Sequence, residues 1–158
     1  MGFPPIAADP GVNRHMTEAT LGIGTFLEYE TVPGASPLAF TKVSEVLDLP
    51  ELPHTREFVE ATNQDSLNQT REYIAGLIDA EEFTVPCNYL PQNATHAAIW
   101  AMFNAGTARK WRVRESTTSP EITWEFDAIV ASFNPAFPVG DKKALAVTLR
   151  RTGPTTRA

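Results

Sequence analysis

Residues 91–114, PQNATHAAIWAMFNAGTARKWRVR, carry the most convincing helical signature of this chain, and a strand pattern follows it at once. Asn93 is placed to cap the helix, because its side-chain oxygen can accept a hydrogen bond from an otherwise unpaired amide of the first turn. Ile99, Met102 and Phe103 then form an apolar stripe at the helical period. The stretch therefore predicts a helix of about a dozen residues, which is marginal alone in water and has to cover a sheet.

Gly106 stands where a left-handed residue ends a helix most easily. From residue 109 to 114 the pattern changes to period two, which predicts a strand. One face of this strand holds Trp111 and Val113, and the other holds the bases Lys110, Arg112 and Arg114. The helix, this strand and a later one predict a common core of Ile99, Trp100, Met102, Phe103, Trp111 and Trp124.

The rest of the chain reads mainly as β-strands, which can form the sheet that this helix has to cover. Alternating or apolar runs predict further strands over residues 21–29, 41–49, 72–79, 83–89, 122–130 and 145–149, with a bulge at Gly76. Thirteen prolines and nine glycines provide many turns. The sequence thus predicts a mainly β fold with one α-helix: a β-sandwich or barrel of six or seven strands with the helix packed on it.

The length of 158 residues fits a single domain. We expect a flexible N-terminal arm over residues 1–16, one β domain over 17–153 and a short tail over 154–158. Residues 53–69 show little regular pattern and predict a long loop, of a size that is usually functional or disordered. We expect no signal peptide and no membrane span, because no apolar run approaches the roughly 20 residues that a bilayer requires.

The sequence offers little chemistry. His15, His54 and His96 are scattered and there is no cysteine cluster, so we expect no metal, no cofactor and no catalytic residue. The single cysteine, Cys87, lies on the same face of a predicted strand as Phe83, Val85 and Tyr89, which favours a buried structural thiol. The three bases of residues 110–114 suit phosphate contacts or ion pairs across a subunit boundary, but a net charge of −6 argues against nucleic-acid capture.

Charge is distributed unevenly along the chain. Residues 45–82 hold ten acidic and two basic side chains, whereas residues 107–158 hold nine basic and five acidic ones. Opposed blocks of this kind suit a head-to-tail contact between identical copies. Two solvated faces of a monomer are the other interpretation.

Two segments resemble the tail tube (major tail) proteins of long-tailed bacteriophages and phage-derived particles. Residues 96–114, with the pattern WxxFNxGxxRxWxVR, resemble the helix–turn–strand of that family. Residues 133–153, FNPAFPVGDKKALAVTLRRTG, resemble its closing turn and final strand. The resemblance extends over most of residues 21–153, and it rests on the order and spacing of these motifs.

The resemblance implies a structural protein of the virion tail, made in the host cytoplasm, and no enzyme. Its relatives form homohexameric rings stacked into a tube, and DNA passes through the lumen without specific binding. The implied partners are tape-measure, tail-tip and tail-terminator proteins. The stretch around residues 53–69 matches an inter-subunit loop, here Arg56, Glu57, Phe58, Glu60 and Asp65.

The lumen of such a tube has to avoid binding DNA, because each phosphate that a base neutralises adds affinity. We therefore expect lumen-facing acids, with Glu57, Glu60, Asp65 and Glu72 as candidates, and an inter-ring basic face of Lys110, Arg112 and Arg114. Alternatives are the tube subunit of a type VI secretion system and a monomeric β-barrel carrier of small ligands; an enzyme comes last.

Overall fold

The computed structural model describes residues 22–66, 68, 70–116 and 120–158. The expected arm of residues 1–16 and the first residue of the first predicted strand, Leu21, lie outside them. The elements in chain order are β1 (Thr25–Glu30), β2 (Phe40–Lys42), β3 (His54–Glu60), β4 (Tyr73–Ala80), β5 (Phe83–Asn88), α1 (Ala94–Ala105), β6 (Arg109–Glu115), β7 (Ile122–Ala136) and β8 (Ala144–Arg157).

The predicted helix is confirmed, together with both of its ends. The Asn93 side chain accepts a hydrogen bond from the Thr95 amide at 2.8 Å, which satisfies one of the unpaired donors of the first turn. At the other end Gly106 has φ +63°, and its amide donates to the Met102 carbonyl at 3.0 Å. A left-handed residue of this kind stops the helix and turns the chain into β6.

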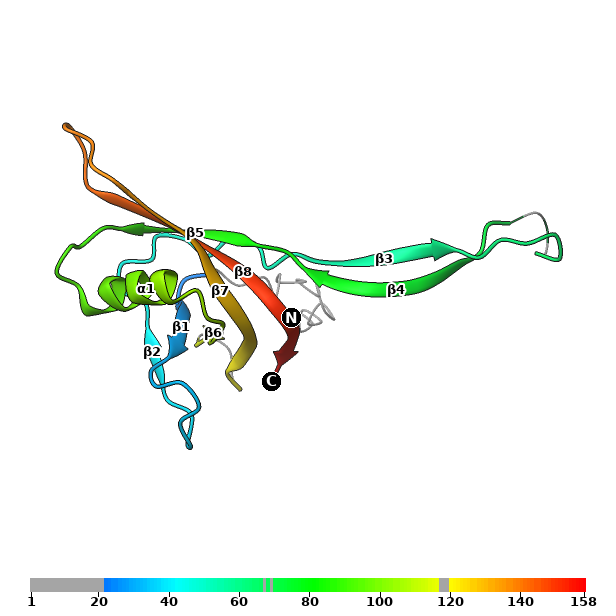
Figure 1. Ribbon diagram of the computed structural model, residues 1–158, viewed down its shortest axis with the longest axis horizontal. Coiled ribbons are helices and arrows are strands. Elements are labelled where there is room, and N and C mark those ends of the chain that lie inside the picture. The colour runs from blue at the N-terminus through cyan, green and yellow to red at the C-terminus, as the bar shows by residue number, and fades with distance from the viewer. Residues whose placement is uncertain (1–21, 67, 69, 117–119) are drawn as a thin grey trace, which may run out of the picture.

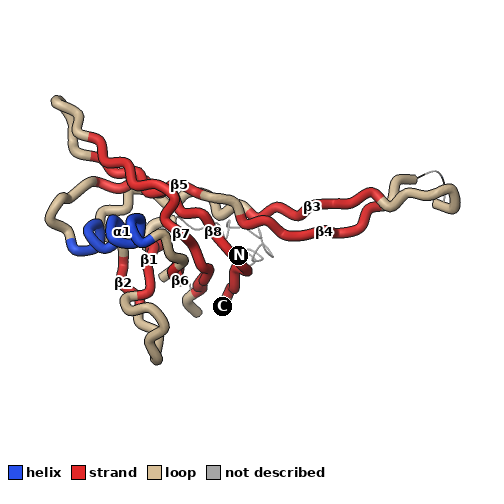
Figure 2. Tube along the Cα trace, in the orientation of Figure 1, coloured by secondary structure: helices blue, strands red, loops and turns tan. Residues whose placement is uncertain are grey.

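Six strands form one antiparallel sheet in the order β2-β1-β6-β7-β8-β5, and β3 pairs with β4 alone (Figures 1 and 2). The mainly β fold with a single helix is confirmed, with eight strands among the described residues instead of six or seven. Alternate residues point to one face of the sheet, where α1 and the segment after β2 cover them. The buried core includes Leu27, Trp111, Phe126, Val147 and Leu149.

Three predictions of strand boundaries are wrong. The last strand, expected over residues 145–149 and followed by a tail over 154–158, runs on as β8 to Arg157, because it pairs with the long strand β7 over most of its length. Of the strand expected over residues 41–49, only β2 forms, because the chain turns away at Glu45, where φ is +61°. Val43, Val46 and Leu49 then lie over the core instead of in the sheet. The loop expected over residues 53–69 contains β3, which pairs with β4 and leaves residues 61–72 as the connection.

One predicted core residue is also misplaced. Trp100 is 47 % exposed, whereas Ile99, Met102 and Trp111 are buried and Phe103 and Trp124 pack partly buried against them. Successive helical residues point about 100° apart. Since Ile99 faces the sheet, Trp100 lies at the rim of the helix, where its ring stacks on Phe103 and meets Phe133 at 5.3 Å between centroids.

A candidate self-assembly surface

The most unusual surface of this molecule is the hairpin β3–β4, here called the arm. It projects away from the six-stranded sheet along the longest axis of the molecule (Figure 1). Its register runs from His54 opposite Ala80 to Glu60 opposite Tyr73, and every residue of β3 is exposed. A two-stranded ribbon has no core of its own and is only marginally stable in water. The stability of the arm therefore depends on packing contacts from outside the hairpin.

The arm carries large apolar side chains on both faces. Residues opposite each other in the register share a face and neighbours alternate, so Phe58, Tyr73 and Ile78 lie on one face and Val59 and Ile74 on the other. These five side chains are between 54 % and 66 % exposed. Strands that read apolar on both faces are typical of sheets covered on both sides. Strand β4, YIAGLIDA, therefore has the composition of a covered strand, whereas β3, HTREFVE, is mostly polar.

A β-bulge interrupts the arm between Arg56 and Phe58, where Gly76 and Leu77 lie opposite Glu57. This confirms the bulge expected at Gly76. A Cβ atom on residue 76 would lie 3.2 Å from the Glu57 carbonyl oxygen, closer than an ordinary contact. Glycine allows the two backbones to approach here. The extra residue in β4 puts Tyr73 and Ile78, five positions apart, on the same face of the arm.

The base of the arm is held by Arg151, which sequence reasoning missed. This side chain is 4 % exposed; its Nε donates to the Glu81 carbonyl at 3.1 Å, and its Nη2 donates to the Pro53 carbonyl. Its Nη1 lies 2.9 Å from Nε2 of His54, whose Nδ1 lies 2.7 Å from the Leu52 carbonyl. Nδ1 therefore donates to the carbonyl, and Nε2 accepts from the guanidinium.

Burial lowers the pKa of the Arg151 guanidinium, and the nearby carboxylates of Asp79 and Glu81 oppose that shift. One cation thus ties the entry to β3 and the exit from β4 to β8. A signal for it existed in the sequence, because Leu145, Val147, Leu149 and Arg151 alternate on the core face of one strand. A basic side chain at a core position predicts a buried hydrogen-bond network, because a buried charge needs partners.

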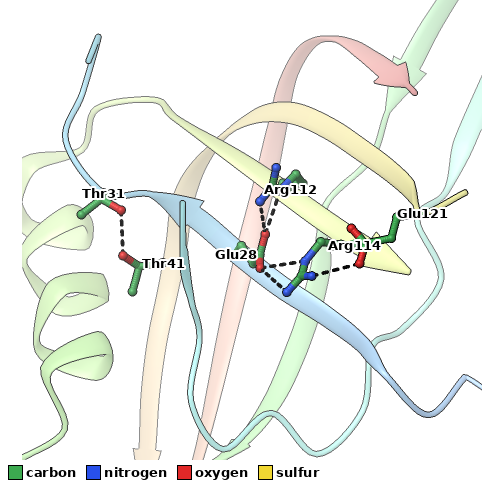
Figure 3. A network of polar contacts seen from close by, with 6 residues as sticks. All are labelled: Glu28, Thr31, Thr41, Arg112, Arg114 and Glu121. Atoms are coloured by element: carbon green, nitrogen blue, oxygen red, sulfur yellow. Dashed lines mark hydrogen bonds and ion pairs between the residues drawn. The ribbon is translucent and has the colours of Figure 1, made fainter. Parts of the chain in front are cut away.

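The bases of the predicted inter-ring face find partners within the subunit. Glu28, with a side chain 6 % exposed, accepts from Nη2 of Arg112 at 2.5 Å and from Nε of Arg114 at 3.0 Å (Figure 3). Arg114 also reaches Glu121 at 3.3 Å, and Lys110 lies 3.6 Å from Asp127. Their charges are therefore largely compensated in one copy.

The four acids predicted to face the lumen are not brought together on one surface. Glu57 and Glu60 are three positions apart on β3, and the extra residue of the bulge is in β4. The two side chains therefore lie on opposite faces of the arm. Glu72 precedes β4, and Asp65 lies in the connection between the strands. Glu60 has Arg71 at 4.0 Å, with both side chains exposed. At most two of these acids share one face of the arm.

Other chemistry is scarce in the part of the chain that the structure describes. No group of three His, Cys, Asp or Glu side chains is placed there to hold a metal ion. No helix among these residues is long and apolar enough to cross a membrane. Cys87 is 1 % exposed, and burial, helped by Glu45, raises the pKa of its thiol to about 11. The thiol is therefore protonated and a poor nucleophile at neutral pH.

Comparisons with known proteins identify this architecture. The family described as "Lambda phage tail tube protein, TTP" matches residues 28–158. This chain belongs to the phage tail tube family. It is a structural component of the tail of a phage or phage-like particle, and no enzyme. The tail tube resemblance seen in the sequence is confirmed, whereas no curated protein matches this chain in sequence.

Solved tail structures have the same fold at low sequence identity. A chain from the tail of an empty gene transfer agent particle superposes with a TM-score of 0.70 at 14% identity, over 89% of this tail tube protein and 99% of that chain. The SPP1 tail tube gives 0.66 at 12% identity, over 88% and 78%. A chain of the anti-feeding prophage baseplate gives 0.68 at 9%, over 90% and 97%.

Proposed function

We propose that this chain is the repeating subunit of the tail tube itself, with six copies in each ring and stacked rings whose lumen conducts DNA during ejection. The arm carries the proposal, because it presents at least five large apolar side chains to solvent in a lone subunit. The six-fold symmetry named for the gene transfer agent tail and for the anti-feeding prophage baseplate supports the ring number.

The energetics of the arm favour contact with further copies. Each exposed apolar side chain gains roughly 1.5–3 kcal/mol when it is fully removed from water. The outer edges of β3 and β4 also leave backbone groups unpaired, which a neighbouring strand can satisfy. A projecting element that fits a different surface on an identical molecule makes a heterologous contact, and such contacts generate rings or helical stacks.

The pairing of Lys and Arg side chains with carboxylates of the same subunit is compatible with the passage of DNA through the tube. Affinity for DNA grows with each phosphate that Lys or Arg neutralises. Here Lys110, Arg112, Arg114 and Arg150 all have a carboxylate of the same subunit within 4 Å. A tube built from such subunits binds DNA weakly wherever these faces lie. The tail-tube resemblance further implies tape-measure, tail-tip and tail-terminator partners.

The test is assembly with and without the arm. The full chain, alone at high concentration or produced with its tail-tip complex, is expected to give stacked rings in negative-stain micrographs. Replacing residues 58–75 by an Asn-Gly turn should leave a folded monomer, because the core lies in the six-stranded sheet. Near-ultraviolet circular dichroism of buried Trp111 verifies that fold.

Two outcomes would contradict the proposal. A full chain that stays monomeric, even beside its tail-tip complex, would remove the chain from the tube wall. Tubes of ordinary length from the shortened chain would keep the tube and exclude the arm as the element that holds it together.

A further inference from the structure

An open aromatic groove runs beside α1, at the end of the molecule away from the arm. It encloses about 410 Å³, and its lining includes Tyr89, His96, Ala97, Trp100, Phe133 and Pro135. No Asp, Glu, Lys or Arg is among the lining residues. Tyr89 and Trp100 approach the same ring, Phe133, at 6.3 and 5.3 Å between centroids. The groove thus exposes aromatic surface that the subunit's own core leaves uncovered.

His96 does not turn this groove into a catalytic or metal site. Its Nδ1 accepts from the Leu90 amide at 3.2 Å, and its Nε2 lies 3.1 Å from the Ser44 carbonyl, to which it therefore donates. Both ring nitrogens are engaged by backbone, and the ring is 2 % exposed. What the groove offers a ligand is apolar and aromatic surface.

The arm offers apolar side chains to match on the face of Phe58, Tyr73 and Ile78, where Arg56 and Glu60 border Phe58 on the same strand. The three apolar side chains are 66 %, 54 % and 58 % exposed. Two of the three are aromatic, and aromatic rings attract each other beyond their burial when they meet edge-to-face or offset-stacked. The opposite face carries the aliphatic Val59 and Ile74.

The two surfaces lie at opposite ends of one molecule. Figure 1 shows the arm extending along the longest axis away from α1, so a single copy cannot bring them together. We infer that the Phe58–Tyr73–Ile78 face of the arm docks into the aromatic groove beside α1 of the next copy. The contact rests on the proposed function, because it joins identical subunits head to tail in the repeating manner that a tube requires.

A disulfide between copies tests this contact in the full chain. Ala75→Cys combined with Ala97→Cys places one thiol on the arm face and one in the exposed wall of the groove, because Ala75 lies opposite Phe58 and shares its face. All three docking side chains are kept. Oxidation of assembled tubes should give a ladder of covalent multimers on a non-reducing gel. Cys87 does not interfere, because it is buried and its pKa is raised to about 11.

The matched control is Val59→Cys with Ala97→Cys. Val59 lies in the next residue pair of the register and is 58 % exposed, but it points to the other face of the arm. This pair should give no ladder. Each single variant should give dimers at most, since a ladder requires two different thiols in every copy.

A second variant removes part of the aromatic wall of the groove. Trp100→Ala should raise the protein concentration at which tubes form by at least tenfold. Val139→Ala, which truncates a fully exposed side chain at the tip of the β7–β8 hairpin, should leave that concentration unchanged.

The outcomes separate this contact from the proposed function. Tubes that form normally but give no 75–97 ladder, or an equal ladder from the 59–97 pair, would overturn the contact and leave the tube intact. The same holds if Trp100→Ala tubes form at the ordinary concentration. If the unmodified chain forms no ring or tube beside its tail-tip complex, the proposed function and this contact both fail.

Discussion

At the level of single residues, the position of the arm depends on one buried cation. Arg151 joins β8 to the backbone on both sides of the arm, through the carbonyls of Pro53 and Glu81. The next residue, Arg150, points to the other face of β8 and reaches Asp79 at 3.8 Å with both side chains about half exposed. Both arginines therefore contact the arm, but Arg151 is buried and binds backbone on both sides of it, whereas Arg150 adds one exposed ion pair.

The Arg151→Met variant tests that assignment. Loss of the guanidinium leaves two carbonyl acceptors without their donor, so we expect stability to fall by about 1–3 kcal/mol. Arg150→Met should cost less than about 1 kcal/mol, because an exposed ion pair contributes little. Urea unfolding measures both, and limited proteolysis should cut the arm of Arg151→Met first. Equal effects of the two variants would show that Arg151 holds nothing in place.

Cys87 gives a pH prediction at the same scale. Its thiol pKa is raised from 9.0 to about 11 in the folded chain, mainly by burial. A raised pKa means that the folded protein keeps a proton that the unfolded chain releases, so this group lowers stability as pH rises from 9 to 11. A thiol reagent should therefore label native protein far more slowly than urea-unfolded protein at pH 8. Rapid labelling of the native chain would place the thiol at the surface.

At the level of elements, local signals predicted α1 and strand β4 of the arm, whereas strand β3 lacked such a signal. The Asn93 cap and the Gly106 stop act within one turn of chain, so the sequence contains them in full. Strand β3 has no alternation of buried and exposed residues, because both of its faces are exposed in the subunit. Trp100 was placed in the core for a related reason: helical spacing shows that a residue is apolar, but not which partner covers it.

Neighbouring residues of α1 test that distinction. Ile99→Ala should cost about 2–5 kcal/mol, since Ile99 is 1 % exposed and truncation leaves a cavity against the sheet. Trp100→Ala should cost less, about 1–3 kcal/mol in the free subunit, because half of the ring is already in water and its loss leaves no enclosed cavity. Thermal unfolding of the monomer compares them. A larger loss at Trp100 than at Ile99 would return that side chain to the core.

At the level of the whole molecule, part of the charge in the two blocks of the sequence is paired inside one subunit. Asp79, from the acidic block, pairs with Arg150 from the basic block inside one subunit. Arg112 and Arg114 share the buried Glu28, which lies outside both blocks. Head-to-tail attraction by net charge is therefore weakened, and the apolar arm is the better candidate for holding copies together. Only the fold reveals this, because the pairs join residues as many as 86 positions apart.

The faces of the arm also sharpen the prediction for the lumen. If the face of Phe58, Tyr73 and Ile78 docks on the next copy, the opposite face, with Glu57 and Asp79, is left to line the tube. That face continues onto the outer face of β8, as the contact between Asp79 and Arg150 shows. Glu57 is then the one strand residue among the four candidate acids that faces passing DNA, whereas Glu60 belongs to the docked face.

Glu57→Lys and Glu60→Lys separate the two faces with the same change of charge on the same strand. Six copies of Glu57→Lys in every ring would present a repeating ring of cations to the phosphates, and each neutralised phosphate adds salt-dependent affinity. Particles with Glu57→Lys should therefore assemble normally yet eject DNA several-fold more slowly at low salt, and recover as salt is raised. Glu60→Lys particles should eject at the ordinary rate whenever tubes form, because position 60 does not face the lumen. Ejection is followed in real time with a DNA-binding dye. Slow, salt-sensitive ejection from Glu60→Lys but not from Glu57→Lys would reverse the assignment of the two faces.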